Sequence, residues 1–380
     1  MIIPKYPATG TTIFSIMSAL ANEHKAINLS QGFPDFPIDE MLGSLVNKAI
    51  MDGFNQYAPM IGLQNLREAI ANKILHFQKV EVNPNTEITI TPGATYAIYT
   101  AFATILQPDD EVIVLEPAYD SYVPNIYTCG ATPVRITLND GTFEIDWNKI
   151  YAAITTKTKA IIINNPHNPC SVTWSEQDFQ HLITLVEKHN LYVVSDEVYE
   201  HLVFDSKEHI SVLRYPELRS RSFVIHSFGK AFHSTGWKMG YCIAPAELMH
   251  AFRAIHQYLA FSVNTPMQQG IATYLDDLSH LETTTRMLQQ RRDFFLEQMK
   301  ATRFKWLKPA AGSYFQLMNY EAISDLPSME FAIWLTKNYS VACIPLSSFY
   351  QDDNNEKWVR FCFAKKEETL MAAVENLKSI

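Results

Sequence analysis

The chain has 380 residues, of which 47% are hydrophobic and 19% are charged, and its formal net charge is -9. This composition is too polar for a membrane protein, and the acidic balance disfavours general binding of nucleic acid, which needs clustered lysine and arginine. We therefore expect a globular protein with one large and one smaller domain, and with neither a membrane span nor a nucleic-acid partner.

The first residues and the pattern of cysteines indicate the cellular compartment in which we expect the protein. The first residues lack the basic start and the apolar run of a signal peptide. The five cysteines are scattered and never form a Cys-x-x-Cys pair, which is more typical of reduced thiols than of a disulfide framework or a zinc site. We expect a cytoplasmic protein without a metal site.

Short β-rich runs alternate with helical patterns from about residue 87 onward. The expected strands are residues 87–91, 111–115, 160–164, 191–195, 222–226 and 240–244, and the expected helices are residues 94–106, 119–129 and 175–189. Strands that are apolar throughout, such as residues 161–163, are typical of a sheet covered by helices on both faces. The alternation predicts βαβ units, and hence an α/β fold with a mostly parallel sheet.

The α/β pattern ends near residue 280. A long helical stretch follows at about residues 281–302, and Pro34 and Pro37 interrupt the first forty or so residues. The expected domains are residues 43–280 for the large one, and residues 1–42 with 281–380 for the small one. Ligands of open α/β sheets bind at the carboxyl ends of the strands, so we expect the functional residues there.

The strongest functional signal directly follows the expected strand at residues 222–226. The sequence from residue 227 is Ser-Phe-Gly-Lys-Ala-Phe-His-Ser-Thr-Gly-Trp-Lys-Met-Gly. Lys230 leaves a buried strand among small and aromatic residues, where desolvation and nearby cations lower the pKa of an amine and make it reactive near neutral pH. Ser227 and Lys238 offer a hydroxyl and a cation to a phosphate group. The alternative, a chance Ser-x-x-Lys in a turn, does not explain the whole stretch.

This stretch resembles the lysine motif of the class I and II aminotransferases, whose usual form has Ser-Phe-Ser-Lys and Gly-Trp-Arg. The chain departs from that form at Gly229 and Lys238; both positions concern phosphate binding, and lysine keeps the charge but not the bidentate fork of arginine. The Phe-Gly-Lys and Gly-Trp-Lys forms resemble the methionine aminotransferase branch. The resemblance implies fold type I, which has a mostly parallel seven-stranded sheet between helices in the large domain and a smaller α+β domain. It also implies that Lys230 carries pyridoxal 5'-phosphate.

Two further motifs stand at the ends of expected strands. Asp196, in Ser-Asp-Glu-Val-Tyr, is placed to pair with a protonated pyridine nitrogen. The resemblance implies that Tyr199 and Asn168, the latter in Asn-Asn-Pro-His-Asn-Pro, reach the 3-oxygen of the cofactor. The alternative for Asp196 is a helix cap. An Asn-Pro turn at Asn168 is compatible with its functional role, because the turn presents the amide.

Two other segments complete the expected cofactor site. In Thr-Pro-Gly-Ala-Thr, Ala94 and Thr95 begin a helix after a strand, where free backbone N–H groups bind phosphate. Tyr119 has the position of the aromatic residue that stacks on the pyridine ring in the family; it would otherwise be assigned to the core. The resemblance implies that Tyr57, in Asn-Gln-Tyr, reaches the phosphate of the neighbouring subunit, so a homodimer is expected.

Residues of the expected small domain concern the substrate. Arg360 lies within an alternating apolar strand, where an unpaired charge is costly and a substrate carboxylate is a natural bidentate partner. The alternative is a structural salt bridge. Gly32 and Phe33 stand in Gly-Phe-Pro-Asp, which resembles the entrance loop of kynurenine, glutamine and methionine aminotransferases. In that family, the glycine backbone contacts the carboxylate and the phenylalanine ring contacts the side chain.

The expected reaction is ping-pong transamination between an amino acid and a 2-oxo acid, with Lys230 as the base at the α-carbon. The candidate side-chain pocket includes Phe14, Phe33 and Tyr96, and no arginine is assigned to a second carboxylate, which favours methionine or aromatic donors. Three alternatives stay open: a kynurenine or glutamine aminotransferase with cysteine-conjugate β-lyase activity, a ligand-sensing regulator, and a structural protein that keeps only the fold. The acidic chain leaves no room for a DNA-binding module before Phe14. A structural role is disfavoured by the joint presence of five site residues: Lys230, Asp196, Asn168, Tyr199 and Arg360.

Overall fold

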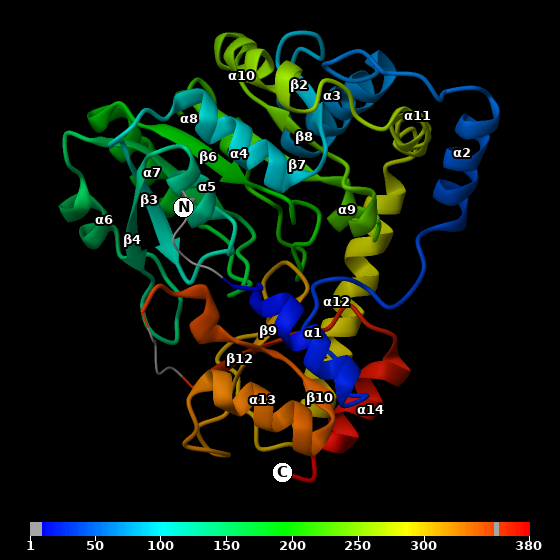
Figure 1. Ribbon diagram of the computed structural model, residues 1–380, viewed down its shortest axis with the longest axis vertical. Helices are drawn as coiled ribbons and strands as arrows, with labels where there is room; N and C mark the ends of the chain where they lie inside the picture. The colour runs from blue at the N-terminus through cyan, green and yellow to red at the C-terminus, as the bar shows by residue number, and fades with distance from the viewer. Residues whose placement is uncertain (1–9, 353–356) are drawn as a thin grey trace, which may run out of the picture.

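The structure is a computed structural model that describes residues 10–352 and 357–380. It has a large part built on one sheet and a smaller part in which α1 (Ile13–Glu23) lies with helices from the end of the chain, as the blue, orange and red ribbons of Figure 1 show. The helix α12 (Ser279–Met299) runs between the two parts. Within the described residues, no helix is long and apolar enough to cross a membrane.

The large sheet has seven strands in the order β2-β8-β7-β6-β5-β3-β4. Their bounds are β2 Ile88–Thr91, β3 Glu111–Glu116, β4 Thr132–Thr137, β5 Thr158–Asn164, β6 Tyr192–Asp196, β7 Ser222–Ser227 and β8 Gly240–Ile243. The two antiparallel pairs, β2–β8 and β7–β8, both involve β8, and the other four pairs are parallel, so the prediction of a mostly parallel seven-stranded sheet is confirmed. The edge strand β4 was not expected, because its residues are largely half-buried or exposed and carry a proline rather than an apolar run.

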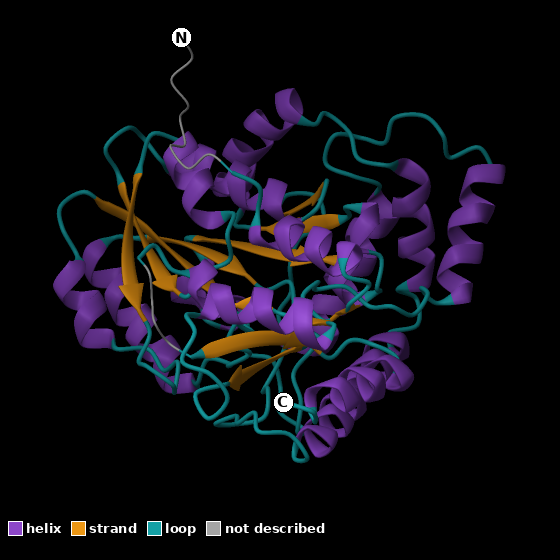
Figure 2. Ribbon diagram, turned by 60° about the horizontal axis from the view of Figure 1, so that its bottom comes forward, coloured by secondary structure: helices purple, strands orange, loops and turns teal. Residues whose placement is uncertain are grey.

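Both faces of this sheet are buried. Ile161 and Ile163 belong to one apolar cluster, whereas Ile162 belongs to a second cluster on the opposite face. Figure 2 shows helices on both sides of the orange sheet. The helices of the large part are α2 Glu40–Met51, α3 Gln64–Gln78, α4 Ala94–Ile105, α5 Tyr122–Thr128, α6 Trp147–Ala153, α7 Glu176–His189, α8 Pro216–Arg219, α9 Phe228–Ala231, α10 Ala246–Leu259 and α11 Thr265–Tyr274.

Local chemistry explains where two of these helices start. The helix α7 follows a capping box in which Ser175 and Asp178 satisfy each other's backbone N–H groups, and it begins where the helix of residues 175–189 is expected. The helix α5 begins at Tyr122, three residues later than expected, because Tyr119 enters a turn and its carbonyl accepts the Tyr122 N–H at 3.2 Å. The delayed start frees the side chain of Tyr119 to face the cavity described below.

The smaller part joins the two ends of the chain. Its strands are β1 Ile27–Asn28, β9 Phe315–Asn319, β10 Val341–Ala342, β11 Ile344–Pro345 and β12 Trp358–Cys362, and its helices include α1, α13 Ser328–Tyr339 and α14 Glu367–Leu377. The antiparallel sheet β11-β12-β9 stands beside a parallel pair in which Ile27 lies opposite Val341. We propose the domain bounds 43–280 and 1–42 with 281–380 on this division; they fall inside α2 and α12.

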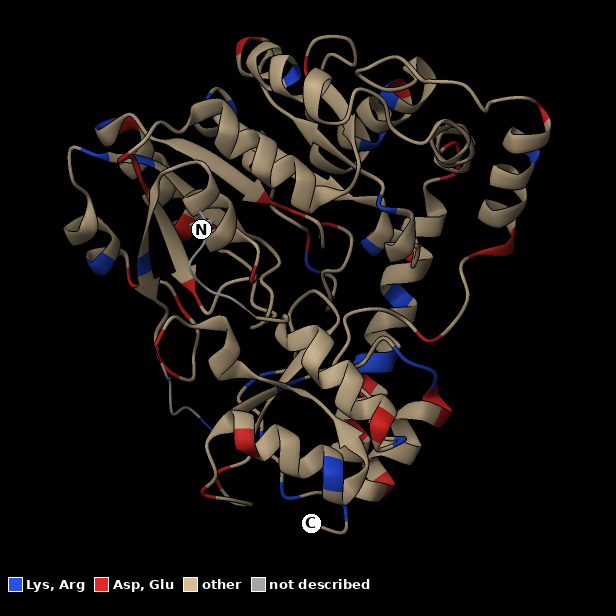
Figure 3. Cartoon of the chain, in the orientation of Figure 1, with Lys and Arg blue, Asp and Glu red and all other residues tan. Residues whose placement is uncertain are grey.

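Charged residues are spread over both parts. In the view of Figure 3, Lys and Arg alternate with Asp and Glu around the periphery instead of gathering on one side.

A cluster of charged and polar side chains is buried inside the large part. Lys73 of α3 bonds Glu200 and Tyr241, and His226 Nδ1 lies 3.0 Å from Glu200 Oε1. Only 3% of the Lys73 side chain and 7% of the Glu200 side chain are exposed. This cluster ties α3 to the ends of β6, β7 and β8.

The buried Lys73–Glu200 pair leads to a prediction about the free energy of unfolding. Changing Lys73→Met is expected to lower the free energy of unfolding by about 3–5 kcal/mol, because it leaves the Glu200 carboxylate buried without its cation. Urea unfolding measures the change. The matched control is Lys48→Met, which breaks the Lys48–Asp52 pair whose side chains are 70% and 46% exposed, and is expected to cost about 0.5 kcal/mol or less. Equal effects of the two changes would contradict the prediction.

Candidate active site

A cavity of about 270 Å³ lies at the carboxyl ends of the central strands, where the small part meets the large sheet. It gathers most of the residues that the sequence predicts: Phe14, Gly32, Ala94, Thr95, Tyr119, Asn168, Asp196, Tyr199, Ser227, Lys230, Lys238 and Arg360. These residues come from both ends of the chain and from its middle. The fold therefore brings together motifs that are far apart in the sequence.

Asp196 is the last residue of β6 and is buried. Its Oδ2 accepts a hydrogen bond from the hydroxyl of Tyr122 at 2.6 Å, and its Oδ1 accepts one from the backbone N–H of Val198 at 3.3 Å. Burial raises the pKa of the Asp196 carboxyl to about 6, against the opposing effect of these hydrogen bonds. Tyr122 was not expected to have a role; its position one helical turn after Tyr119 is the only sequence signal for it.

Lys230 lies in the single turn of α9, directly after β7. Its Nζ lies 3.1 Å from the hydroxyl of Tyr314 and 3.4 Å from the carbonyl oxygen of Gly32. Burial, and after it the nearby Arg360 cation, together lower the pKa of the Lys230 amine to about 8. Gly229 fits this tight turn, because a β-carbon there would lie 3.0 Å from the Cα of Thr235.

The amino end of α4 forms a site for an anion. Gly93 caps the helix with φ 85°, a left-handed conformation that favours glycine. A β-carbon on Gly93 would lie 3.5 Å from Nζ of Lys238, so this cation stands beside the first turn. The N–H groups of Ala94 and Thr95 in that turn precede the first intrahelical bonds. Backbone donors and a cation together suit a phosphate.

Arg360 in β12 is buried, and its partners are neutral. Nη1 donates to Oδ1 of Asn168 at 2.6 Å, Nη2 donates to the carbonyl of Ser30 at 3.0 Å, and the guanidinium stands 3.8 Å from the ring centroid of Phe315. Nε has no hydrogen-bond partner, and no carboxylate of residues 10–352 or 357–380 forms an ion pair with Arg360. Burial lowers the pKa of this guanidinium to about 10. A carboxylate supplied by a ligand suits this position better than a structural salt bridge.

The contact with Arg360 orients Asn168. Since an arginine only donates, the amide of Asn168 turns its oxygen toward Arg360 and its NH₂ group the other way. The backbone N–H of Asn168 donates to Oδ1 of Asn164 at 2.6 Å, which fixes the turn. Tyr199 lies buried in the same cavity, and burial raises the pKa of its hydroxyl. Asn168 and Tyr199 are therefore both available as neutral donors.

Three predicted residues do not line this cavity. Phe33 is 45% exposed and lies under the ammonium of Lys365, which is 4.9 Å from its ring centroid. Tyr96 bonds Nδ1 of His256 at 3.0 Å. Tyr57 is 82% exposed. Their roles in substrate binding or across a subunit interface stay predictions.

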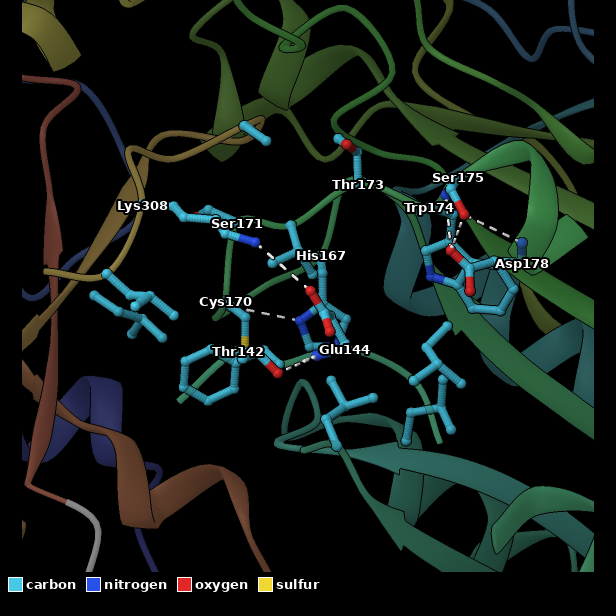
Figure 4. A pocket seen from close by; sticks show the side chains of 18 of the residues that line it. Thr142, Glu144, His167, Cys170, Ser171, Thr173, Trp174, Ser175, Asp178 and Lys308 are labelled. Atoms are coloured by element: carbon cyan, nitrogen blue, oxygen red, sulfur yellow. Dashed lines mark hydrogen bonds and ion pairs between the residues drawn. The ribbon is translucent and has the colours of Figure 1, made fainter. Parts of the chain in front are cut away.

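A larger cavity of about 500 Å³ backs onto the turn that carries Asn168 (Figure 4). His167, Cys170 and Ser171 lie on its wall, and Nδ1 of His167 accepts the backbone N–H of Cys170 at 3.4 Å. Burial lowers the pKa of His167 to about 4, so its ring is neutral. None of the predicted site residues lines this cavity. Despite its smaller size, the cavity of Lys230 and Arg360 therefore holds the candidate chemistry.

Comparison with known proteins decides the family. A family model described as aminotransferase class I and II matches residues 24–377. The chain belongs to the class I and II aminotransferases. The methionine aminotransferase of Escherichia coli (strain K12) is 45% identical over 377 residues, which cover 99% of this chain and 97% of that protein. This aminotransferase chain is also 34% identical to the kynurenine–oxoglutarate transaminase of Dictyostelium discoideum, over 97% of this chain and 94% of the other.

A solved structure agrees with the assignment to the aminotransferases. A crystal structure of an Escherichia coli protein, for which a methionine aminotransferase function was identified, is 44% identical and covers 100% of both chains with a TM-score of 0.97. The expectation of a fold type I aminotransferase with a large, mostly parallel sheet is thereby confirmed.

The raised pKa of Asp196 predicts a pH effect on this aminotransferase when no ligand is bound. The folded state holds the Asp196 proton up to a pKa of about 6, against 3.8 in the unfolded chain. The free energy of unfolding therefore loses about 3 kcal/mol as pH rises from about 4 to about 6. Asp196→Asn removes this loss, so the variant is expected to match wild type near pH 4 and to exceed it at pH 7. Urea unfolding at both pH values checks this; a wild-type advantage at pH 7 would contradict it.

Proposed function

We propose that the chain is a pyridoxal 5'-phosphate-dependent aminotransferase whose amino donor is methionine or another bulky or aromatic amino acid, and whose acceptor is a 2-oxo acid. One observation carries the proposal. A buried lysine amine, a buried carboxylate and a buried arginine without an ionic partner, namely Lys230, Asp196 and Arg360, line a single cavity. The similarity to the Escherichia coli methionine aminotransferase supports the choice of donor.

The residues present fit the cofactor. The first turn of α4 with Lys238 and Ser227 suits its phosphate, and the Asp196 carboxylate suits its ring nitrogen. The unpartnered Nε of Arg360 leaves a charged donor for a substrate carboxylate. When bound, pyridoxal 5'-phosphate supplies an aldehyde for the amino group and a ring that withdraws electrons from the substrate α-carbon.

Each residue of the site has its own role in the proposed transamination. Lys230 carries the cofactor and, once its amine is free, moves the proton of the α-carbon. Asp196 would hold the protonated ring nitrogen of the bound cofactor, and Tyr199 and Asn168 would donate hydrogen bonds to its 3-oxygen. Arg360 binds the carboxylate of the amino acid. Both half-reactions use this one site, so the kinetics are ping-pong.

The lining of the cavity favours an apolar side chain. Among the described residues that line it, the cations are Lys230, Lys238 and Arg360, each of which already has a role. No cation is left for a second carboxylate, whereas Phe14 and Phe315 add aromatic surface. Methionine and aromatic amino acids therefore fit better than aspartate. Kynurenine is the second candidate, because a kynurenine–oxoglutarate transaminase is 34% identical to the chain.

An absorbance titration tests the proposal. The purified chain, reconstituted with pyridoxal 5'-phosphate, is expected to show a visible band that methionine removes and 4-methylthio-2-oxobutanoate restores. Aspartate serves as the control donor, and kynurenine and a cysteine S-conjugate are added separately. The absence of any band would overturn the proposal. A band that responds to kynurenine but not to methionine would move the donor assignment to the second candidate.

We also propose a homodimer in which Tyr57 reaches the phosphate site of the neighbouring subunit. Tyr57 is exposed and packs edge-to-face on Phe261, with ring centroids 5.3 Å apart, and Tyr258 is 85% exposed. Exposed aromatic side chains that contact each other are typical of interfaces between subunits. A complete site would then need two chains.

Hybrid dimers test this arrangement. A dimer of one Lys230→Ala chain and one Tyr57→Ala chain has one site with both defects and one site with neither, if Tyr57 acts across the interface. We expect such hybrids to have about half of the wild-type kcat. If Tyr57 acts within its own subunit, the hybrid shows only half of the activity of the Tyr57→Ala homodimer. Sedimentation of the wild-type chain as a monomer would also overturn the proposal.

A further inference from the structure

Tyr314 touches the catalytic lysine, although no sequence motif points to it. It stands immediately before β9, is fully buried, and lies 84 residues from Lys230 in the sequence. Its hydroxyl oxygen is 3.1 Å from Nζ of Lys230 and 2.5 Å from the carbonyl oxygen of Gly32. Nζ of Lys230 is itself 3.4 Å from the same carbonyl. The three groups form a closed triangle.

The direction of each hydrogen bond in this triangle follows from the groups present. The Tyr314 hydroxyl has one hydrogen and two neighbouring oxygens, the carbonyl of Gly32 at 2.5 Å and the hydroxyl of Tyr199. The carbonyl can only accept, whereas the Tyr199 hydroxyl can also donate, so the hydrogen of Tyr314 is assigned to the carbonyl of Gly32. The oxygen of Tyr314 is then left as an acceptor for Lys230. A neutral amine has two hydrogens and one lone pair, and Tyr314 and Gly32 take up both hydrogens. Tetrahedral geometry places the lone pair on the side away from both acceptors.

Tyr314 is held firmly enough to act as a fixed acceptor. The backbone N–H of Ser313 donates to the carbonyl of Leu202 at 2.8 Å, and the N–H of Phe363 donates to the carbonyl of Tyr314 at 3.0 Å. The ring stands edge-on to Tyr199, with centroids 5.2 Å apart. Contacts on both sides of the residue therefore fix the position of its hydroxyl.

We propose that Tyr314 is a positioning residue for Lys230. Its hydroxyl, held by the carbonyl of Gly32, accepts a hydrogen bond from the lysine amine and keeps the lone pair directed at the reacting atoms whenever the amine is free. This inference rests on the proposed role of Lys230 in transamination. The inference explains why a tyrosine is buried at position 314. It also gives the carbonyl of Gly32 a second role, in addition to the proposed contact with the substrate.

The first test uses the cofactor-free chain and the variant Tyr314→Phe. The rate at which an acylating reagent labels Lys230 is followed against pH by mass spectrometry of the peptide. Loss of an acceptor disfavours the ammonium form, so the midpoint is expected to fall by about 0.5–1 pH unit. The matched control is Tyr320→Phe, a buried tyrosine whose hydroxyl donates to the carbonyl of Leu326 at 2.9 Å outside the cavity. Its midpoint is expected to equal that of wild type.

The second test uses the reconstituted enzyme. Tyr314→Phe is expected to lower kcat about 10-fold with KM within about twofold, and to raise the isotope effect of an α-deuterated donor, because only proton transfer is misaligned. Should Tyr314→Phe fail to fold, 4-fluorophenylalanine at position 314 fills the same space with a poor acceptor. A variant that matches wild type in labelling midpoint and isotope effect overturns the inference. A wild-type chain that takes up no cofactor overturns the proposed function instead.

Discussion

Replacing Lys230 by alanine is expected to lower kcat for transamination by about 10⁴-fold or more, the largest effect of any single change in the chain. The variant loses both the attachment of the cofactor and the base at the α-carbon. Because Lys230 is buried in a cavity, its removal is not expected to unfold the protein. Single-turnover measurements with methionine give the rate, and the absorbance of the bound cofactor reports the altered attachment.

A small amine provides the control for this change. Alanine leaves space where the side chain of Lys230 stood, so added methylamine is expected to restore part of the proton-transfer rate in Lys230→Ala. Lys230→Arg keeps a cation and fills that space, so it is expected to be inactive and to gain nothing from methylamine. Transamination by Lys230→Ala at more than a hundredth of the wild-type rate without added amine would contradict the role given to Lys230.

Changing Arg360→Lys is expected to lower kcat/KM about 10²-fold, which corresponds to about 3 kcal/mol of transition-state binding. Lysine keeps the positive charge, but it cannot hold a carboxylate with two parallel hydrogen bonds. It also gives up the contact of the guanidinium with Oδ1 of Asn168, which orients that amide. Steady-state kinetics with methionine at several concentrations measure the loss.

Arg292→Lys separates this effect from a general loss of stability. Arg292 is also buried and holds both oxygens of Asp205, at 2.8 and 2.6 Å, but it does not line the cavity. We expect Arg292→Lys to lower the unfolding midpoint and to leave kcat/KM within about twofold of wild type. Similar kinetic losses in the two variants would contradict the assignment of the substrate carboxylate to Arg360.

The fold was predictable wherever a local pattern decides the structure. The apolar runs of the inner strands and the cap at Ser175 have such patterns, and the family assignment followed from the residues around Lys230. The edge strand β4 lacks an apolar run, and the turn at Tyr119 depends on a cavity that the sequence does not show. A buried apolar strand such as the edge strand β2 is therefore easier to predict than a half-exposed edge strand such as β4.

The candidate site was predictable where its residues belong to a sequence motif. It was not predictable where a residue enters the site only through contacts with residues that are far away in the sequence. Tyr314 acts on Gly32 and Lys230, which are 282 and 84 residues away, and no spacing rule links such positions. Tyr122 bonds Asp196 across 74 residues. The roles given to the motif residues, and the cytoplasmic location, stay predictions that the experiments above address.

The pairing of β1 with β10 has a consequence for the order in which the chain becomes an enzyme. Residues 27 and 28 leave the ribosome early, but their partners Val341 and Ala342 are made when nearly the whole chain has been synthesised. All seven strands of the large sheet are complete by residue 243. During synthesis, the large sheet can assemble before β10, the strand that pairs with the N-terminal segment next to Gly32, has been made. Lys230 therefore gains its contacts with Gly32 and Tyr314 only after the large sheet has been synthesised, and a nascent chain that already has its main core is not yet able to position the amine.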